Sequence, residues 1–110
     1  MQIDKAVSQL NLKDLKPMES VVGAEIKIAE IKLVIEENGW FDQAAIAIKD
    51  ELDETIYLLD GHHRLAAARE LGLTEIPVLL IEFSDLPKFY LYYNSMEEIR
   101  MAAKKVKKFR

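Results

Sequence analysis

The spacing of apolar residues along the chain predicts alternating strands and helices. Residues 9–16 alternate between apolar and polar positions, which predicts a short strand that ends near Pro17. Within residues 21–37, apolar side chains recur at i, i+4, i+7 and i+11, the spacing of one helix face. The same stretch is rich in isoleucine and partly alternates, so a strand is the alternative. Its length favours a helix, which Asn38 and Gly39 are suited to end.

Two short apolar segments follow and predict a β-hairpin. Residues 43–49 and 55–59 are rich in alanine, isoleucine and leucine, and charged, turn-like residues separate them. Residues 62–71 then have the pattern of a helix, and Gly72 is suited to the left-handed position at its end. Residues 76–83 form an almost continuous apolar run, which is typical of a strand buried on both faces.

The chain changes character after this strand. Pro87 lies in a break, and four of the nine aromatic residues lie within residues 89–93. Ser95 and Glu98 have the spacing of a capping box, which predicts a last helix that begins near Met96.

The predicted order is strand, helix, strand, strand, helix, strand, helix. This order indicates an α/β (α+β) fold with a small mixed β-sheet and flanking helices. A length of 110 residues suits one folding unit. Within it, we expect residues 1–84 to form the main domain and residues 85–110 to form an aromatic linker and a basic C-terminal helix.

Charge is distributed unevenly along the chain. Residues 1–99 contain nine basic and 19 acidic residues, a net charge of −10, whereas residues 100–110 carry +6 and no acid. A basic segment on an acidic body predicts contact with an anionic partner, such as DNA or RNA, or with the body itself. The alternative is a solvated helix end, where cations are favourable. The candidate nucleic-acid contacts are Arg100, Lys104, Lys105, Lys107 and Lys108.

The amino-acid composition excludes several classes of protein for this chain. With 50% hydrophobic and 31% charged residues, the chain has ordinary globular composition. The absence of cysteine excludes disulfides, thiolate metal sites and cysteine-based catalysis. No apolar run reaches the length of a membrane span, and no signal-peptide pattern is present, so we expect a cytoplasmic protein without a membrane partner.

The candidate chemistry lies where the second hairpin strand meets the next helix, at Asp60, Gly61, His62, His63 and Arg64. A helix N-terminus offers unpaired N–H groups and positive potential to a phosphate. Glycine has no Cβ to block a ligand, while histidine and arginine supply donors. Asp60 is the candidate ligand for Mg²⁺ beside the phosphates. These five residues therefore form a candidate phosphate-binding turn.

Structural interpretations of the same residues stay open. Adjacent histidines cannot face the same way on a helix, so one of them is a candidate core residue. Arg64 could pair with Glu70 or another acid instead of a ligand. A zinc site is disfavoured because no third ligand has a recognisable spacing.

This segment resembles a known signature. Residues 60–72, DGHHRLAAARELG, followed by IPV at residues 76–78, resemble the ParB/sulfiredoxin superfamily, in which a strand, a G-x-x-R turn, an alanine-rich helix and a further strand follow in this order. Residues 12–17 resemble the opening strand of the family, and residues 35–39 resemble the end of its first helix. The resemblance covers about residues 9–83.

The resemblance implies that the turn binds nucleotide phosphates. Members include sulfiredoxins that use ATP, ParB proteins that bind CTP, free-serine kinases and ParB-like nucleases. Sulfiredoxin chemistry needs a cysteine in the turn, where this chain has His62 and His63, so that activity is excluded. We expect no DNA-binding domain of a partition protein, because 110 residues are too few for a second domain.

The form Asp-Gly-His-His-Arg is most similar to the serine-kinase-like members. In those, a glutamate after the first strand's Lys-Pro is implicated in catalysis, and Glu19 stands at that position. A carboxylate there could orient a hydroxyl group or a water molecule for attack on a phosphoryl group. The alternative is that Glu19 caps or begins the following helix.

The main functional hypothesis is a domain that binds ATP or ADP with Mg²⁺ and hydrolyses the nucleotide or a phosphodiester, as an ATPase or nuclease. Its candidate catalytic residues are Glu19, His62 and His63. One alternative is a nucleic-acid-binding module that uses the basic tail. Another is a phosphotransferase to a small hydroxyl substrate, and a third is a non-catalytic nucleotide sensor that dimerises through its last helix.

Overall fold

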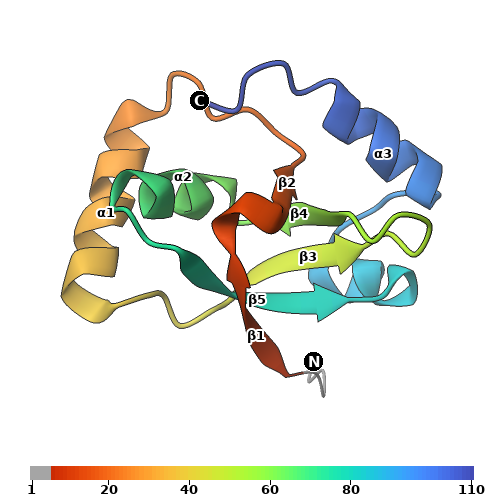
Figure 1. Ribbon diagram of the computed structural model, residues 1–110, viewed down its shortest axis with the longest axis horizontal. Helices are drawn as coiled ribbons and strands as arrows, with labels where there is room; N and C mark the ends of the chain where they lie inside the picture. The colour runs from red at the N-terminus through yellow and green to blue at the C-terminus, as the bar shows by residue number, and fades with distance from the viewer. Residues whose placement is uncertain (1–5) are drawn as a thin grey trace.

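A five-stranded mixed sheet with helices on both faces forms the body of the protein (Figure 1). The computed structural model describes residues 6–110. The predicted α/β architecture is confirmed. The strands are β1 (Val7–Asn11), β2 (Leu15–Pro17), β3 (Ala45–Lys49), β4 (Ile56–Asp60) and β5 (Glu75–Ile81). The helices are α1 (Glu25–Asn38), α2 (His62–Glu70) and α3 (Met96–Lys104), with 3₁₀-helices η1 (Leu12–Asp14) and η2 (Phe83–Phe89).

The sheet has the strand order β1-β5-β3-β4-β2. The β3–β4 and β1–β5 pairs are antiparallel, whereas the β3–β5 and β2–β4 pairs are parallel. The predicted hairpin of β3 and β4 is confirmed. The parallel β2–β4 pair brings the loop after β2 to the same end of the sheet as the turn between β4 and α2.

The segment predicted as one strand, residues 9–16, is divided in two by η1, so that prediction was wrong. The Asn11 side chain accepts the N–H of Lys13 at 2.9 Å, and the N–H of Leu12 donates to the carbonyl of Thr74 at 3.0 Å. The polar cap turns the chain away from the strand direction. As a result, β1 and β2 lie on opposite edges of the sheet.

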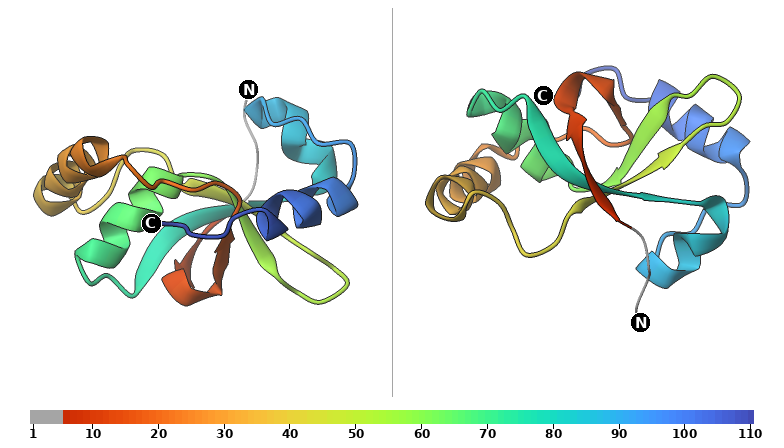
Figure 2. Two further views of the ribbon diagram at one scale, coloured as in Figure 1. Left: turned by 90° about the horizontal axis from the view of Figure 1, so that it is seen from above. Right: turned by 60° about the horizontal axis from the view of Figure 1, so that its bottom comes forward.

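This connection requires the sheet to curl. Opposite edges of a flat five-stranded sheet lie about 19 Å apart. The four residue steps from Asn11 to Leu15 span at most about 14 Å. The sheet therefore bends until its two edges approach, as Figure 2 shows.

Helix α1 begins at Glu25 and not at residue 21, and its helical state excludes the strand alternative. It ends as predicted, because Gly39 has a φ of 83° and donates its N–H to Ile35 at 2.7 Å. Ile28 and Ile35 are buried against α2. The alanines of α2 allow the two helices to pack closely, and this packing forms one wall of the site described below.

Apolar side chains alternate between two cores along β4. Leu58 packs with Leu65 of α2, whereas Tyr57 and Leu59 pack with Ile99 of α3. Successive side chains of a strand point to opposite faces, so both faces of the sheet must be covered. Figure 2 shows α1 and α2 on one side of the sheet and η2 and α3 on the other.

The last part of the chain packs onto this body. Helix α3 begins at Met96 as predicted, and the Ser95 hydroxyl accepts the N–H of Glu98 at 3.2 Å. The predicted break at Pro87 lies inside η2. The division of the chain at residues 84 and 85 stays a prediction. Within the described residues, the helices are too short or too polar to cross a membrane.

A buried ion pair connects the β3–β4 hairpin to α3. Asp50 is 1% exposed and accepts hydrogen bonds from Arg100 Nε at 2.6 Å and Nη2 at 3.0 Å. It also accepts the N–H of Leu52 at 3.0 Å. The Arg100 guanidinium holds the pKa of Asp50 at about 2, below its usual 3.8.

Because the folded pKa is depressed, this pair stabilises the protein fully above pH 3.8 and loses that effect as the pH falls towards about 2. We expect Asp50→Asn to lower the free energy of unfolding at pH 7. The difference from the wild type should shrink between pH 4 and pH 2, because protonated aspartic acid resembles asparagine. Urea unfolding at several pH values measures this. Glu51→Gln, at an exposed neighbouring position, is the control, and a difference that persists undiminished at pH 2 would contradict the prediction.

Candidate functional site

The turn between β4 and α2 needs a glycine for two reasons. Gly61 has a φ of 108°, a left-handed conformation that side chains disfavour. A Cβ there would also lie 3.1 Å from the Cβ of Ala45 on β3. The turn therefore presses closely on the sheet, and α2 begins directly after it with the N–H groups of its first turn unpaired within the helix.

A cavity of about 740 Å³ opens at this helix N-terminus. The turn residues Asp60–Arg64 form one side of it. The other lining residues come from the loop after β2, from α1 and from the loop before β3: Glu19, Lys27, Ile31, Phe41, Asp42 and Gln43. The structure thus brings together all the turn residues and Glu19, which lie about 40 positions apart in the sequence.

A larger cavity of about 1000 Å³ lies at the other end of β3, beside Asp50 and Arg100. Asp50 and Arg100 already bind each other there, as described above. None of the residues that we predicted for phosphate binding or catalysis lines it. The smaller cavity is therefore the candidate site.

His62 is a buried link between the turn and the loop that carries Glu19. The residue is 3% exposed, and its Nε2 accepts the backbone N–H of Met18 at 2.9 Å. Nδ1 therefore carries the proton of the neutral ring and faces Glu19 Oε2 at 3.1 Å. Burial lowers the pKa of His62, while the charges of Glu19 and Asp60 oppose this change. Both ring nitrogens are engaged by the protein, which favours a holding role over proton transfer to a ligand.

Glu19 presents its carboxylate to the cavity. Its side chain is 73% exposed although one oxygen contacts His62. The interpretation that Glu19 caps or begins the next helix is wrong, because the N-cap of α1 is Ala24 and Glu25 is the acid of its first turn. The two histidines diverge as expected: His62 is buried and the partly exposed His63 lines the cavity.

Arg64 holds the loop before β3. Its Nη1 donates to the carbonyl of Gln43 at 2.7 Å, and its guanidinium carbon lies 5.5 Å from the centroid of the Phe41 ring. Nη2 lies 4.0 Å from Asp60 Oδ2. Of the two predicted alternatives for Arg64, the pair with Glu70 is wrong, because Glu70 pairs with Lys32 and Arg110, whereas the pair with another acid is met by Asp60. Arg64 therefore lines the cavity and orders one of its walls.

Sequence reasoning missed Lys27. This cation lies on α1, lines the cavity and forms no ion pair within residues 6–110. Its position one helical turn before Ile31, which also lines the cavity, is the signal in the sequence. Phe41 and Gln43 were missed as well, since loop residues carry no periodic pattern.

Asp60 is the predicted ligand for Mg²⁺. Its side chain is 61% exposed and lines the cavity. In the described part of the chain, no three histidine, aspartate or glutamate side chains are grouped to hold a metal ion. Mg²⁺ commonly binds through one or two carboxylates, waters and substrate phosphates, and Asp60 fits that pattern.

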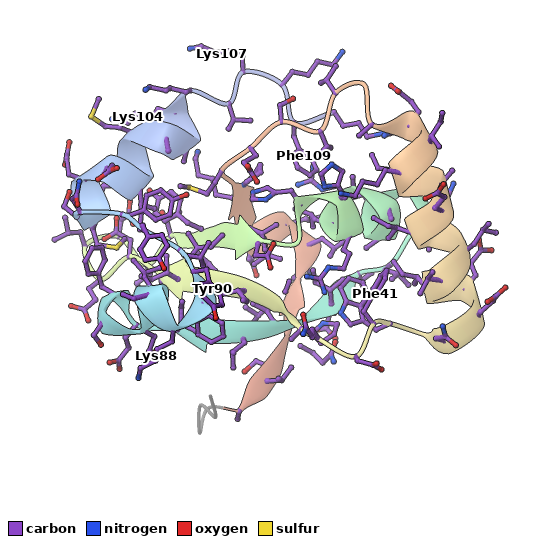
Figure 3. The ribbon with its side chains drawn as sticks, turned by 180° about the vertical axis from the view of Figure 1, so that it is seen from behind. Phe41, Lys88, Tyr90, Lys104, Lys107 and Phe109 are labelled. Atoms are coloured by element: carbon purple, nitrogen blue, oxygen red, sulfur yellow. The ribbon has the colours of Figure 1, made fainter. Side chains whose placement is uncertain are left out.

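The basic residues of the last segment have different surroundings. Arg100 is occupied by Asp50 and by Glu97, whose carboxylate lies 3.4 Å from Nη1. The lysines 104, 105, 107 and 108 are exposed, and Figure 3 shows Lys104 and Lys107 at the rim of the molecule. A role for these residues in nucleic-acid binding stays a prediction.

Comparison with known protein families identifies the chain. The model of the ParB N-terminal domain matches residues 2–96. The chain belongs to the ParB N-terminal domain family. Its predicted membership of the ParB/sulfiredoxin superfamily is thereby confirmed.

Two curated relatives are L-serine kinases. An ATP-dependent L-serine kinase of Staphylothermus marinus is 29% identical over 76 residues, which cover 69% of this chain and 29% of the kinase. An ADP-dependent L-serine kinase of Thermococcus kodakarensis is 32% identical over 85 residues, which cover 76% of this chain and 34% of the kinase. The chain thus spans about a third of the length of these relatives.

Solved structures share the fold. A free serine kinase in complex with AMP has a TM-score of 0.63 and 24% identity, over 78% of this chain and 37% of the kinase. Sulfiredoxin from Arabidopsis thaliana has a TM-score of 0.61 and 21% identity, over 80% of this chain and 99% of sulfiredoxin. A Pnob8-like ParB-N domain has a TM-score of 0.57 and 17% identity, over 81% of this chain and 34% of that chain.

Gly72 allows a test of whether Gly61 is needed for its close contact with Ala45 as well as for its positive φ. Gly72 also has a positive φ, 76°, but a Cβ there would meet nothing within 4 Å. We expect Gly72→Ala to cost about 1 kcal/mol of unfolding free energy and Gly61→Ala about 2 kcal/mol or more, because only the latter adds a steric conflict with β3. Urea denaturation of both variants measures the difference. Equal losses would show that the approach to Ala45 is unimportant.

Proposed function

We propose that this domain binds ATP or ADP at the N-terminus of α2 and transfers a phosphoryl group to the hydroxyl of a small substrate of the serine type. One observation carries the proposal: the helix N-terminus and the Glu19 carboxylate face the same cavity. A phosphate site and a candidate base are thus available to one bound substrate pair. The two serine kinase relatives support this alternative over the main hypothesis of an ATPase or nuclease.

The part of the cavity next to the turn offers positive potential from the N-terminus of α2 and from the side chain of Lys27. The first N–H groups of α2 have no partner within the helix, and the helix dipole favours an anion there. Lys27 adds a cation from α1, and Gly61 lines the same cavity. These groups suit the terminal phosphates of a nucleotide. Asp60 would hold Mg²⁺, which supplies charge neutralisation between the phosphates when it is bound.

Glu19 is suited to act on the acceptor hydroxyl. Its carboxylate would accept the proton as the hydroxyl oxygen attacks the terminal phosphorus of the nucleotide. The bond from that phosphorus to the bridging oxygen breaks, and ADP leaves from ATP, or AMP from ADP. The products are the nucleotide shortened by one phosphate and the phosphorylated hydroxyl.

His62 would prepare Glu19 for this role without exchanging a proton with the substrate. Its Nδ1 lies 3.1 Å from Glu19 Oε2, a contact that limits the directions that Glu19 can take. The same ring accepts the N–H of Met18 and so positions the backbone next to Glu19. His63, which lines the cavity, is the histidine left to contact a phosphate or the acceptor.

Lys27 provides a test of the binding site. We expect Lys27→Ala to weaken ATP or ADP binding about tenfold, because a charged hydrogen bond to a phosphate is lost. Lys32→Ala is the matched control, since Lys32 lies on the same helix but pairs with Glu70 outside the cavity. Calorimetric titration with each nucleotide, with and without Mg²⁺, measures the affinities. Equal affinity in the two variants would remove Lys27 from the site.

Glu19 provides a test of the chemistry. We expect Glu19→Gln to bind nucleotide normally but to lose about 10²- to 10⁴-fold in the rate of phosphoserine formation, because the amide cannot accept the proton. Phosphorus NMR with ATP or ADP and free serine follows the product, and Glu36→Gln on the exposed side of α1 is the control. Release of inorganic phosphate by the wild type without phosphoserine would instead favour the hydrolase hypothesis.

A further inference from the structure

The segment that follows α3 returns to the candidate site. We call residues 105–110 the terminal segment. The carbonyl of Phe109 accepts the N–H of Val21 at 2.7 Å, and the Ser20 hydroxyl lies 3.4 Å from the same oxygen. These contacts join the terminal segment to the loop after β2, across 88 positions of sequence.

The side chains of the terminal segment also contact α2. The Phe109 ring packs beside α2 (Figure 3), with its centroid 6.4 Å from that of the His62 ring. The guanidinium carbon of Arg69 lies 4.7 Å from the centroid of the Phe109 ring. Arg110 Nε lies 2.7 Å from Glu70 Oε2. The segment is therefore held along α2 as well as at the loop.

The loop that carries Glu19 is consequently held on both sides of that residue. His62 bonds the N–H of Met18 on one side, and Phe109 accepts from Ser20 and Val21 on the other. Val21 is only 2% exposed, whereas the Glu19 side chain is 73% exposed. The backbone around Glu19 is thus anchored while its carboxylate stays open to the cavity.

We propose that Phe109 is a positioning residue of the active site, which holds the loop of Glu19 in place and covers the His62 ring. The proposal rests on the phosphoryl-transfer function above, because it assigns Phe109 an effect on the group that acts in that reaction. Phe109 does not line the cavity and acts through Glu19 and His62.

Two consequences follow from the removal of the ring. The loop would gain freedom, and a displacement of about 1 Å at a reacting group can cost about 100-fold in rate. The His62 ring, which accepts the N–H of Met18 on the other side of Glu19, would also lose the cover of the Phe109 ring.

The experiment compares Phe109→Ala with Phe89→Ala in the whole chain. Phe89 is the matched control because it is also a half-buried phenylalanine, but it packs against the core on the other face of the sheet. Phe109→Leu is the conservative variant that keeps apolar cover. For each protein, hydrogen exchange of the Met18 and Val21 amides is recorded by NMR, together with kcat and KM for phosphoserine formation.

We expect Phe109→Ala to speed the exchange of the Met18 and Val21 amides about tenfold or more and to lower kcat about 10- to 100-fold, with little change in the KM for nucleotide. Phe109→Leu should restore most of both properties, and Phe89→Ala should change neither. Unchanged amide exchange in Phe109→Ala, or the same acceleration in Phe89→Ala, would overturn the proposal. Because amide exchange needs no substrate, it decides the matter even if no phosphoserine is formed, a result that would count only against the proposed function.

Discussion

The three-residue connection η1 is the constraint on which the arrangement of the molecule depends. It joins the two edge strands of one sheet, and such a short link is possible only when the sheet curls. The curl brings β2 alongside β4 in a parallel pair, so that both strands end at the same side. The loop after β2 and the turn before α2 therefore meet, and the candidate site lies where they do.

Where the loop and the turn meet, the buried His62 connects them. A neutral ring can be buried there at a lower desolvation cost than a charged side chain. His62 accepts one backbone hydrogen bond through Nε2, and its Nδ1 lies 3.1 Å from Glu19 Oε2, so both nitrogens of a ring that is 3% exposed contact the protein. Arg64 orders the opposite wall through Gln43 and Phe41. Two residues of the phosphate turn thus support the cavity, and its open face is left to Glu19, Lys27 and the helix N-terminus.

The last segment extends this support beyond the part of the chain that resembles its relatives. The match to the family ends at residue 96, whereas Phe109 and Arg110 contact the loop of Glu19 and α2. Arg100 and Asp50 attach the preceding helix at the far end of β3. Two of the six basic residues at the end of the sequence, Arg100 and Arg110, therefore form ion pairs within the protein, while the four exposed lysines lie between them.

The sequence by itself determined the fold class, the hairpin, the C-terminal ends of α1 and α2 and the turn between β4 and α2, because periodicity, glycines and caps act over a few neighbouring residues. It misjudged residues 9–16, where a single polar cap at Asn11 redirects the chain. It named Glu19 only by resemblance and missed Lys27, and it gave no sign that Phe109 returns to Val21. Only the tertiary structure decided these points, because they depend on contacts between residues tens of positions apart, which the curl of the sheet and the packing of α1 on α2 bring together.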